Sequence, residues 1–122
     1  MTQYRALILR ISFSALLVAT GIQAGPLELA GHSHRESEKV VHDAQHDVDH
    51  AWEVYHRAAL GGTLASPALQ ADIEQHLHEA RTLVTQAREA AERGDEGLVQ
   101  SFVSQVKIHT AKAIEGSKEK KK

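Results

Sequence analysis

The sequence predicts an all-α protein, an up-down antiparallel bundle of three long helices that follows an N-terminal signal peptide. Apolar residues recur at alternating steps of three and four, which is the spacing of the buried face of an amphipathic helix. Short segments that contain glycine separate these periodic stretches, as they do between antiparallel neighbours in a bundle. No stretch alternates between apolar and polar residues with a period of two, so we expect no sheet.

The first 24 residues have the layout of a secretory signal peptide. Arg5 and Arg10 supply positive charge, residues 11–22 form a short apolar run, and small residues lead to Ala24, the best cleavage residue. An uncleaved membrane anchor is the alternative, but a span needs about 20 apolar residues and Arg10 interrupts this run. We therefore expect export to the periplasm, cleavage after Ala24 and no membrane association of the mature chain.

The composition of the mature chain excludes several classes of protein. The 98 residues left after cleavage suffice for one small domain. Loss of Arg5 and Arg10 changes the net charge from −2 to −4, which argues against a general nucleic-acid binder despite the lysine-rich segment at 118–122. The chain has no cysteine, and its only methionine is Met1, so disulfides and sulfur ligands for metals are absent. All nine histidines remain.

The mature chain is expected to consist of a flexible leader that contains histidine at 25–33, a helical bundle domain at 34–116 and a basic tail at 117–122. Ser33 and Glu36 have the spacing of a capping box at the start of the first helix, which ends at Gly61 and Gly62. The buried face of this helix is expected to comprise Val41, Ala44, Val48, Ala51, Tyr55 and Ala58.

Two further helices follow. Ser66 and Pro67 have the identities of an N-cap and a first helical residue, and the second helix ends at Gly94. Asp95 caps the third helix, which ends near Gly116. The expected buried faces are Ile73, Leu77, Ala80, Val84, Ala87 and Ala91 on the second helix, and Val99, Phe102, Val103, Val106, Thr110 and Ala113 on the third. Alanine buries little area per position, so we expect a thin core and modest stability.

The densest run of histidines lies on the first helix. His42, His46 and His50 follow one another at steps of four, so their Cβ atoms are about 5–6 Å apart along one face, away from the apolar face. Two imidazoles at this spacing can bind one metal ion, and neighbouring carboxylates can complete the shell or orient a ring. The other candidate ligands on this face are Asp49, Glu53 and His56. A solvated surface or a pH-responsive one remains the alternative.

The other histidines give weaker signals. His32 and His34 lie in the predicted leader, from which they could reach a metal ion on the bundle. His76 and His78 are two residues apart, or about 200° around a helix, so one ion cannot easily bridge them. Antiparallel folding places His50, His76 or His78, and His109 within about one turn along the bundle axis, which makes a second, interhelical site an open hypothesis. His109 alone is also compatible with a partly buried structural role.

These features resemble a known family. The leader GHSH and the phrases KVVHDAQHDVDHA and IHTAKAIEGSKEKK, after a signal peptide, are similar to the small metal-binding proteins of bacterial periplasms, which are His-rich four-helix bundles without cysteine that bind copper and other divalent metals. The resemblance implies ligands at the helix-face positions His42, His46, His50, His76 and His109. The chain departs from the family in having three expected helices and no histidine in residues 84–106, which implies a lower metal capacity.

The sequence thus favours a periplasmic buffer or carrier of divalent transition metals. Imidazole and carboxylate ligands suit Cu(II), which is expected to bind best, and also Ni(II) and Zn(II). No enzyme is expected, because Ser101 and Ser104 lack a base at recognisable spacing and neither a Gly-rich phosphate loop nor an HExxH motif occurs. The expected partners are metal ions, and no nucleic acid.

The main alternative is a periplasmic stress or chaperone-like protein that binds partners through an apolar surface. Trp52 and Val54 are the main apolar residues off the first buried face, and a homodimer or a neighbouring helix could cover them. Non-covalent haem binding is more remote, because no CxxCH motif occurs and aromatic residues are few.

Overall fold

The computed structural model describes the backbone of residues 25–120 and the side chains of residues 31–120. It contains three α-helices, α1 (Gly25–Leu60), α2 (Pro67–Glu92) and α3 (Glu96–Lys118). The all-α prediction is confirmed, since the described residues form no strand beyond an isolated bridge between Leu64 and Lys120. None of these helices has a stretch long and apolar enough to cross a membrane. The predicted signal peptide and its cleavage position lie outside the described residues.

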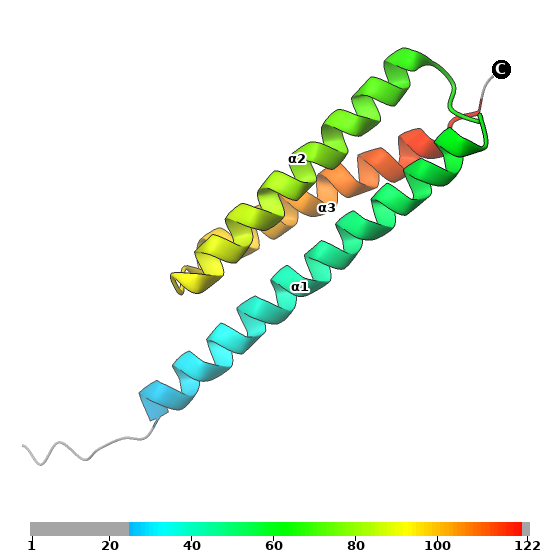
Figure 1. Cartoon of the computed structure of the whole chain (residues 1–122). Coiled ribbons are helices and arrows are strands. Elements are labelled where there is room, and N and C mark those ends of the chain that lie inside the picture. The colour runs from blue at the N-terminus through cyan, green and yellow to red at the C-terminus, as the bar shows by residue number, and fades with distance from the viewer. Residues whose placement is uncertain (1–24, 121–122) are drawn as a thin grey trace, which may run out of the picture.

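All three helices pack against one another (Figure 1). The most extensive contact is between α2 and α3, which a tight turn joins. The connection between α1 and α2 lies beside the end of α3, where Leu64 pairs with Lys120. Consecutive helices therefore run in opposite directions. The N-terminal turns of α1 extend beyond the turn between α2 and α3 (Figure 1).

The predicted helix starts and turns are seen at α2 and α3. The Ser66 side chain accepts a hydrogen bond from the Leu69 backbone N–H at 3.1 Å, and Pro67 occupies the first turn. Asp95 accepts in the same way from the Leu98 N–H at 3.1 Å. Gly94 has a φ of 73°, a backbone conformation that other residues rarely adopt. Side-chain capping and this glycine together position the turn between α2 and α3.

The core comprises the predicted faces of the three helices, except that Ala58 and Phe102 are only partly buried and pack against it. Its largest fully buried side chains are Ile73, Leu77, Val48, Val84, Val99 and Val106. Most of the remaining buried apolar residues are alanines, which let the helices approach closely but contribute little apolar area. Leu83 and Ala90 are also buried, although they were not among the predicted core residues. The expectation of a thin core thus agrees with the residues found inside.

The segment predicted as a flexible leader is instead part of helix α1, which continues through residues 25–33. Pro26 suits the first turn of a helix, and the leucines and Glu28 that follow are good helix formers. The capping box at Ser33 and Glu36 consequently does not start the helix. Ser37 is buried, and with Ala91 and Gly94 it lines a small cavity, so α1 contacts the α2–α3 turn at this level.

Helix α3 ends at Lys118, two residues beyond Gly116, near which the sequence predicted its end. A Cβ atom placed on Gly116 would lie 2.9 Å from Cγ1 of Ile73, closer than real Cβ contacts. The residue is buried against α2. This glycine therefore permits close approach of α3 to α2 rather than terminating α3.

Candidate metal centre

His42 and His46 form a ring pair on the exposed side of α1. Their ring centroids are 4.5 Å apart in an edge-to-face arrangement, and 71% of the His42 side chain is exposed. Both rings lie outside the core, which α1 enters through Val41, Ala44 and Val48. The step of four residues thus brings two imidazoles together in solvent, where a metal ion can reach them.

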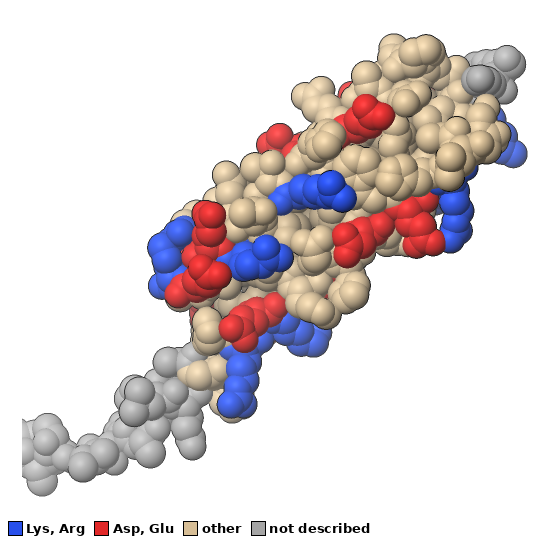
Figure 2. Space-filling model, in the orientation of Figure 1, with Lys and Arg blue, Asp and Glu red and all other residues tan. Residues whose placement is uncertain are grey.

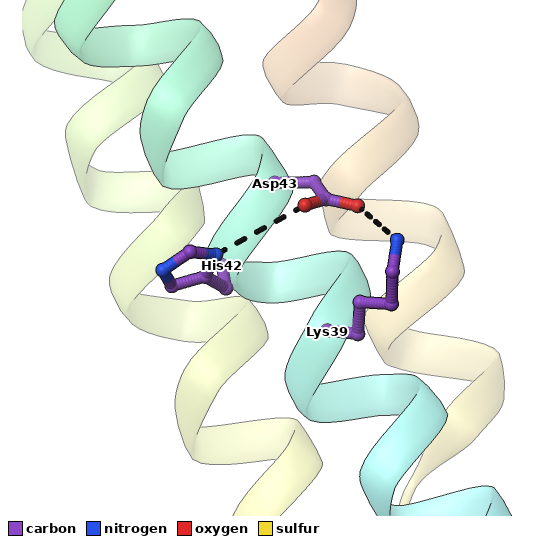
Figure 3. Close-up of polar contacts among 3 residues, drawn as sticks. All are labelled: Lys39, His42 and Asp43. Atoms are coloured by element: carbon purple, nitrogen blue, oxygen red, sulfur yellow. Dashed lines mark hydrogen bonds and ion pairs between the residues drawn. The ribbon is translucent and has the colours of Figure 1, made fainter.

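Asp43 lies beside this pair, although it was not among the predicted ligands (Figure 3). One carboxylate oxygen accepts a hydrogen bond from Lys39 Nζ at 2.8 Å, and the other is 4.0 Å from His42 Nδ1. The hydrogen bond from Lys39 is the main cause that lowers the pKa of Asp43, and the same contact raises the pKa of Lys39. The spacing of four residues between Lys39 and Asp43 could have indicated this ion pair from the sequence. Asp43 supplies negative charge next to the imidazole of His42.

The carboxylates predicted for this face make other contacts. Asp49 accepts a hydrogen bond from Gln45 Nε2 at 3.0 Å, and Glu53 pairs with Arg57. Neither is hydrogen-bonded to a histidine within the described residues, and His50 is exposed. Of the six candidates on this face, the structure therefore brings only His42 and His46 close together.

His56 and His78 lie against Trp52 instead. Their ring centroids are each 5.4 Å from that of the indole, His56 from the same helix and His78 from α2. The Arg81 guanidinium lies 4.4 Å from the indole centroid, a cation–π contact that stabilises the packing of α2 on α1. The Trp52 Nε1 atom is buried without a hydrogen-bond partner. Sequence reasoning missed this cluster, which covers the indole with side chains of the same chain.

His76 and His109 meet between α2 and α3. Their Nδ1 atoms are 2.9 Å apart, so one ring donates a hydrogen bond to the other. Nε2 of His76 lies 3.7 Å from Oδ2 of Asp72, and only 19% of the His76 side chain is exposed. Asp72 was not among the predicted site residues, although its spacing of four residues from His76 on a helix could have indicated that the two side chains lie close together. The structure thus joins two histidines that are 33 residues apart in the sequence.

Burial is the main cause that lowers the pKa of His109. Coulombic interaction with His76, when that ring is protonated, and with Lys112 lowers it further, whereas Glu79 acts in the opposite direction. A lowered pKa keeps the imidazole neutral, which is the form that binds metals.

Of the residues predicted to form an interhelical site, which were His50, His76 or His78, and His109, the structure brings together only His76 and His109. His78 lies two residues beyond His76, about 200° around α2, and contacts α1 instead. In the part of the chain whose side chains are described, no three His, Asp or Glu side chains are placed to hold one metal ion.

His34 lies on α1 rather than in a leader, with Nε2 3.0 Å from Oε1 of Glu38. Together with His42 and Arg88 of α2, these residues line a groove of about 320 Å³. His32 is exposed on the same helix. The histidines at 32 and 34 point in different directions around α1, because a step of two turns through about 200°.

Basic and acidic side chains alternate over the face of the molecule seen in Figure 2. This view shows no broad surface of a single sign. The chain as a whole is slightly acidic, with a net charge of −2.

Comparison of the chain with models of known protein families, with curated proteins and with solved structures found no match in any of the three. A function for this chain must therefore be argued from its own residues and their geometry.

Proposed function

We propose that this protein binds divalent transition metal ions through the exposed histidines of α1, with Cu(II) preferred over Ni(II) and Zn(II). The observation that carries the proposal is the His42–His46 pair. The two ring centroids are 4.5 Å apart, and both rings lie on the exposed face of α1, outside the core. Helix α1 fixes their spacing, so the two imidazoles are held near each other before a metal ion arrives.

The chemistry of the pair suits these ions. Imidazole nitrogens with nearby carboxylate oxygens favour Cu(II), Ni(II) and Zn(II), and the general order of affinity places Cu(II) first. Asp43 is the nearest carboxylate, and Asp49 and Glu53 can reach the pair only by leaving their partners Gln45 and Arg57. An exposed site of two histidines exchanges its ion readily with solvent ligands. This property fits a metal buffer or carrier.

The proposed location is the periplasm. It is supported by the layout of residues 1–24, with Arg5 and Arg10 before a short apolar run and small residues up to Ala24. It is also supported by the resemblance to the small periplasmic metal-binding proteins, which rests on the phrases around His42, His46 and His109. Mass spectrometry of protein from the bacterial envelope should find a chain that starts near Gly25, whereas the full chain in the cytosol would refute export.

We infer no catalytic role. The Ser104 hydroxyl donates a hydrogen bond to the Gln100 carbonyl at 2.8 Å, so it is engaged with its own helix. An apolar docking surface has less support than metal binding. Trp52, the residue that most suggested such a surface, is covered by His78 and Arg81. Among the side chains that the structure describes, the exposed large apolar ones are Leu60, at the end of α1, and Leu98 and Ile108, on α3.

Calorimetric titration of the full chain with Cu(II), Ni(II) and Zn(II) tests the proposal. A variant with His42→Gln and His46→Gln should lose at least one bound ion per chain. The matched control is His50→Gln, which removes an exposed histidine of the same helix without touching the pair. An unchanged number of bound ions in the double variant would refute the α1 pair as a metal site.

A further inference from the structure

We propose that His76 and His109 form a second metal site, in which both rings bind one divalent ion through Nδ1 and so tie α2 to α3. The proposal rests on the proposed function in taking the same class of ion, but it concerns other residues. The two rings come from different helices and face each other at an Nδ1–Nδ1 distance of 2.9 Å. This pair is therefore a property of the folded bundle, unlike the pair on α1.

The distance fits two ligands of one ion. Metal–imidazole bonds are about 2.0–2.1 Å long, so two nitrogens at right angles around one ion lie about 2.9 Å apart. Two nitrogens at a tetrahedral angle would lie about 3.3 Å apart. Right angles are typical of tetragonal Cu(II), and tetrahedral angles of Zn(II). The observed 2.9 Å matches the former and needs only a small movement for the latter.

The protons of the two rings can also be placed. The carboxylate of Asp72, 3.7 Å from Nε2 of His76, favours a proton on that nitrogen. Nδ1 of His76 is then the acceptor, and the proton between the rings belongs to Nδ1 of His109. His76 is thus already in the form that binds a metal through Nδ1. His109 must release its Nδ1 proton to solvent and take one up at Nε2, with no net change in charge.

Asp72 completes a familiar arrangement. Histidines that bind metals usually donate their second ring N–H to a carboxylate, which fixes the tautomer and makes the ring a better ligand. Asp72 lies near this position for His76, one helical turn earlier on α2, and at 3.7 Å its carboxylate must move slightly closer to accept the Nε2–H. Asp72 lies on the Nε2 side of the imidazole, away from Nδ1, so it orients the ring and is not itself a ligand of this ion.

The site at His76 and His109 differs from the α1 pair in the effect of a bound ion on the stability of the fold. An ion held by two helices binds the folded bundle better than the unfolded chain, so it stabilises the packing of α2 against α3. The His76 side chain is 19% exposed, compared with 71% for His42, so an ion at the inner site is also less accessible.

The first test uses nuclear magnetic resonance on the full chain with His42→Gln and His46→Gln, which lacks the outer pair. Without metal, we expect the imidazole ¹⁵N signals to show the Nε2–H tautomer for His76 and the Nδ1–H tautomer for His109. With Zn(II), a diamagnetic probe, both rings should have the Nε2–H tautomer and shifted Nδ1 signals. Signals of His76 and His109 that ignore saturating Zn(II) would overturn the proposal.

The second test measures the melting temperature in the same background with Cu(II). Adding His109→Gln should abolish most of the rise caused by Cu(II), while the matched change His50→Gln should preserve it. An equal rise with His109→Gln would contradict the inner site. If the His109 variant does not fold, Asp72→Asn keeps both ligands and should weaken Cu(II) binding by about tenfold. Unchanged affinity in that variant would contradict the arrangement proposed here.

The two proposals fail in different ways. Loss of all metal binding on replacement of His42 and His46 would refute the inner site and leave the α1 pair in place. Unchanged binding after that replacement, together with Zn(II)-dependent signals of His76 and His109, would refute the α1 pair and support the inner site.

Discussion

Single residues set the contacts between the helices. Tyr55 of α1 donates a hydrogen bond to Glu74 of α2 and is itself buried. Burial is the main cause that raises the pKa of Tyr55, so its hydroxyl stays protonated and keeps donating. The hydrogen bond from Tyr55 is in turn the main cause that lowers the pKa of Glu74 below its ordinary 4.5. This contact makes the packing of α1 on α2, near the connection between them, sensitive to pH.

Replacing Tyr55 with phenylalanine should reduce the acid sensitivity of the fold. Glu74 binds protons less readily in the folded chain than in the unfolded one. Its contribution is therefore complete above pH 4.5 and is lost as the pH falls through the lowered pKa. Urea denaturation should find Tyr55→Phe less stable than the parent at pH 7, with a smaller difference near pH ~3. Glu74→Gln should show the same trend, and a difference independent of pH would contradict this account.

Gly116→Ala should destabilise the protein, because the new methyl group would meet Cγ1 of Ile73 at 2.9 Å. Overpacking costs about 1–3 kcal/mol, of which the better helix propensity of alanine returns up to about 1 kcal/mol. Gly97→Ala on the same helix is the control, since its nearest contact is an Asp95 oxygen at 3.7 Å. Thermal denaturation should rank the control above Gly116→Ala, and the reverse order would mean that α2 and α3 can separate without cost.

At the scale of the helix, α1 uses one face for packing and the other for histidines. Its apolar face enters the core through Val41, Ala44 and Val48, while His42 and His46 stay in solvent. The two faces are separate, so changes on the histidine side should leave the fold intact.

Replacing His42, His46 and His50 together by alanine should preserve the helix and remove the metal ions bound on α1. Alanine is the best helix former, and none of the three rings belongs to the core. Circular dichroism should show the same helical content or slightly more, and calorimetry fewer ions per chain. A loss of helical signal would mean that these rings support the fold in a way their exposure does not suggest.

The sequence predicted the helices and their buried faces well, since the period of apolar residues and the caps Ser66 and Asp95 depend on local chemistry. It could not predict how each helix is rotated against its neighbours. That rotation decides that His76 meets His109 and that His78 contacts Trp52. The sequence predicted that these histidines lie at the same level along the bundle axis, but it could not predict in which direction each side chain points. The contact between Gly116 and Ile73 was missed for the same reason, because Ile73 lies on another helix.

For the whole molecule, metal and stability should be coupled. A ligand that prefers the folded state stabilises it by about 2.7 kcal/mol at a hundredfold excess over Kd. In a domain of this size each kcal/mol raises the Tm by roughly 4–8 °C. Saturating Cu(II) should therefore raise the Tm of the full chain by about 10 °C or more. Copper that binds to histidines of the unfolded chain makes this rise smaller. Calorimetric scans with and without Cu(II) measure this, and an unchanged Tm despite bound copper would place the ions on segments independent of the fold.

The tryptophan packed between α1 and α2 makes the chain its own fluorescent reporter. Trp52 is the only tryptophan, and His78 and Arg81 of α2 hold its indole against the bundle. Detachment of α1 would bring the ring into water and shift its emission to longer wavelength. Because α2 and α3 share the most extensive contact, a copper ion bridging them can protect that hairpin while α1 still opens. The shift of the Trp52 emission maximum, which reports detachment of α1, would then occur at a lower temperature than the unfolding of the α2–α3 hairpin in the same sample.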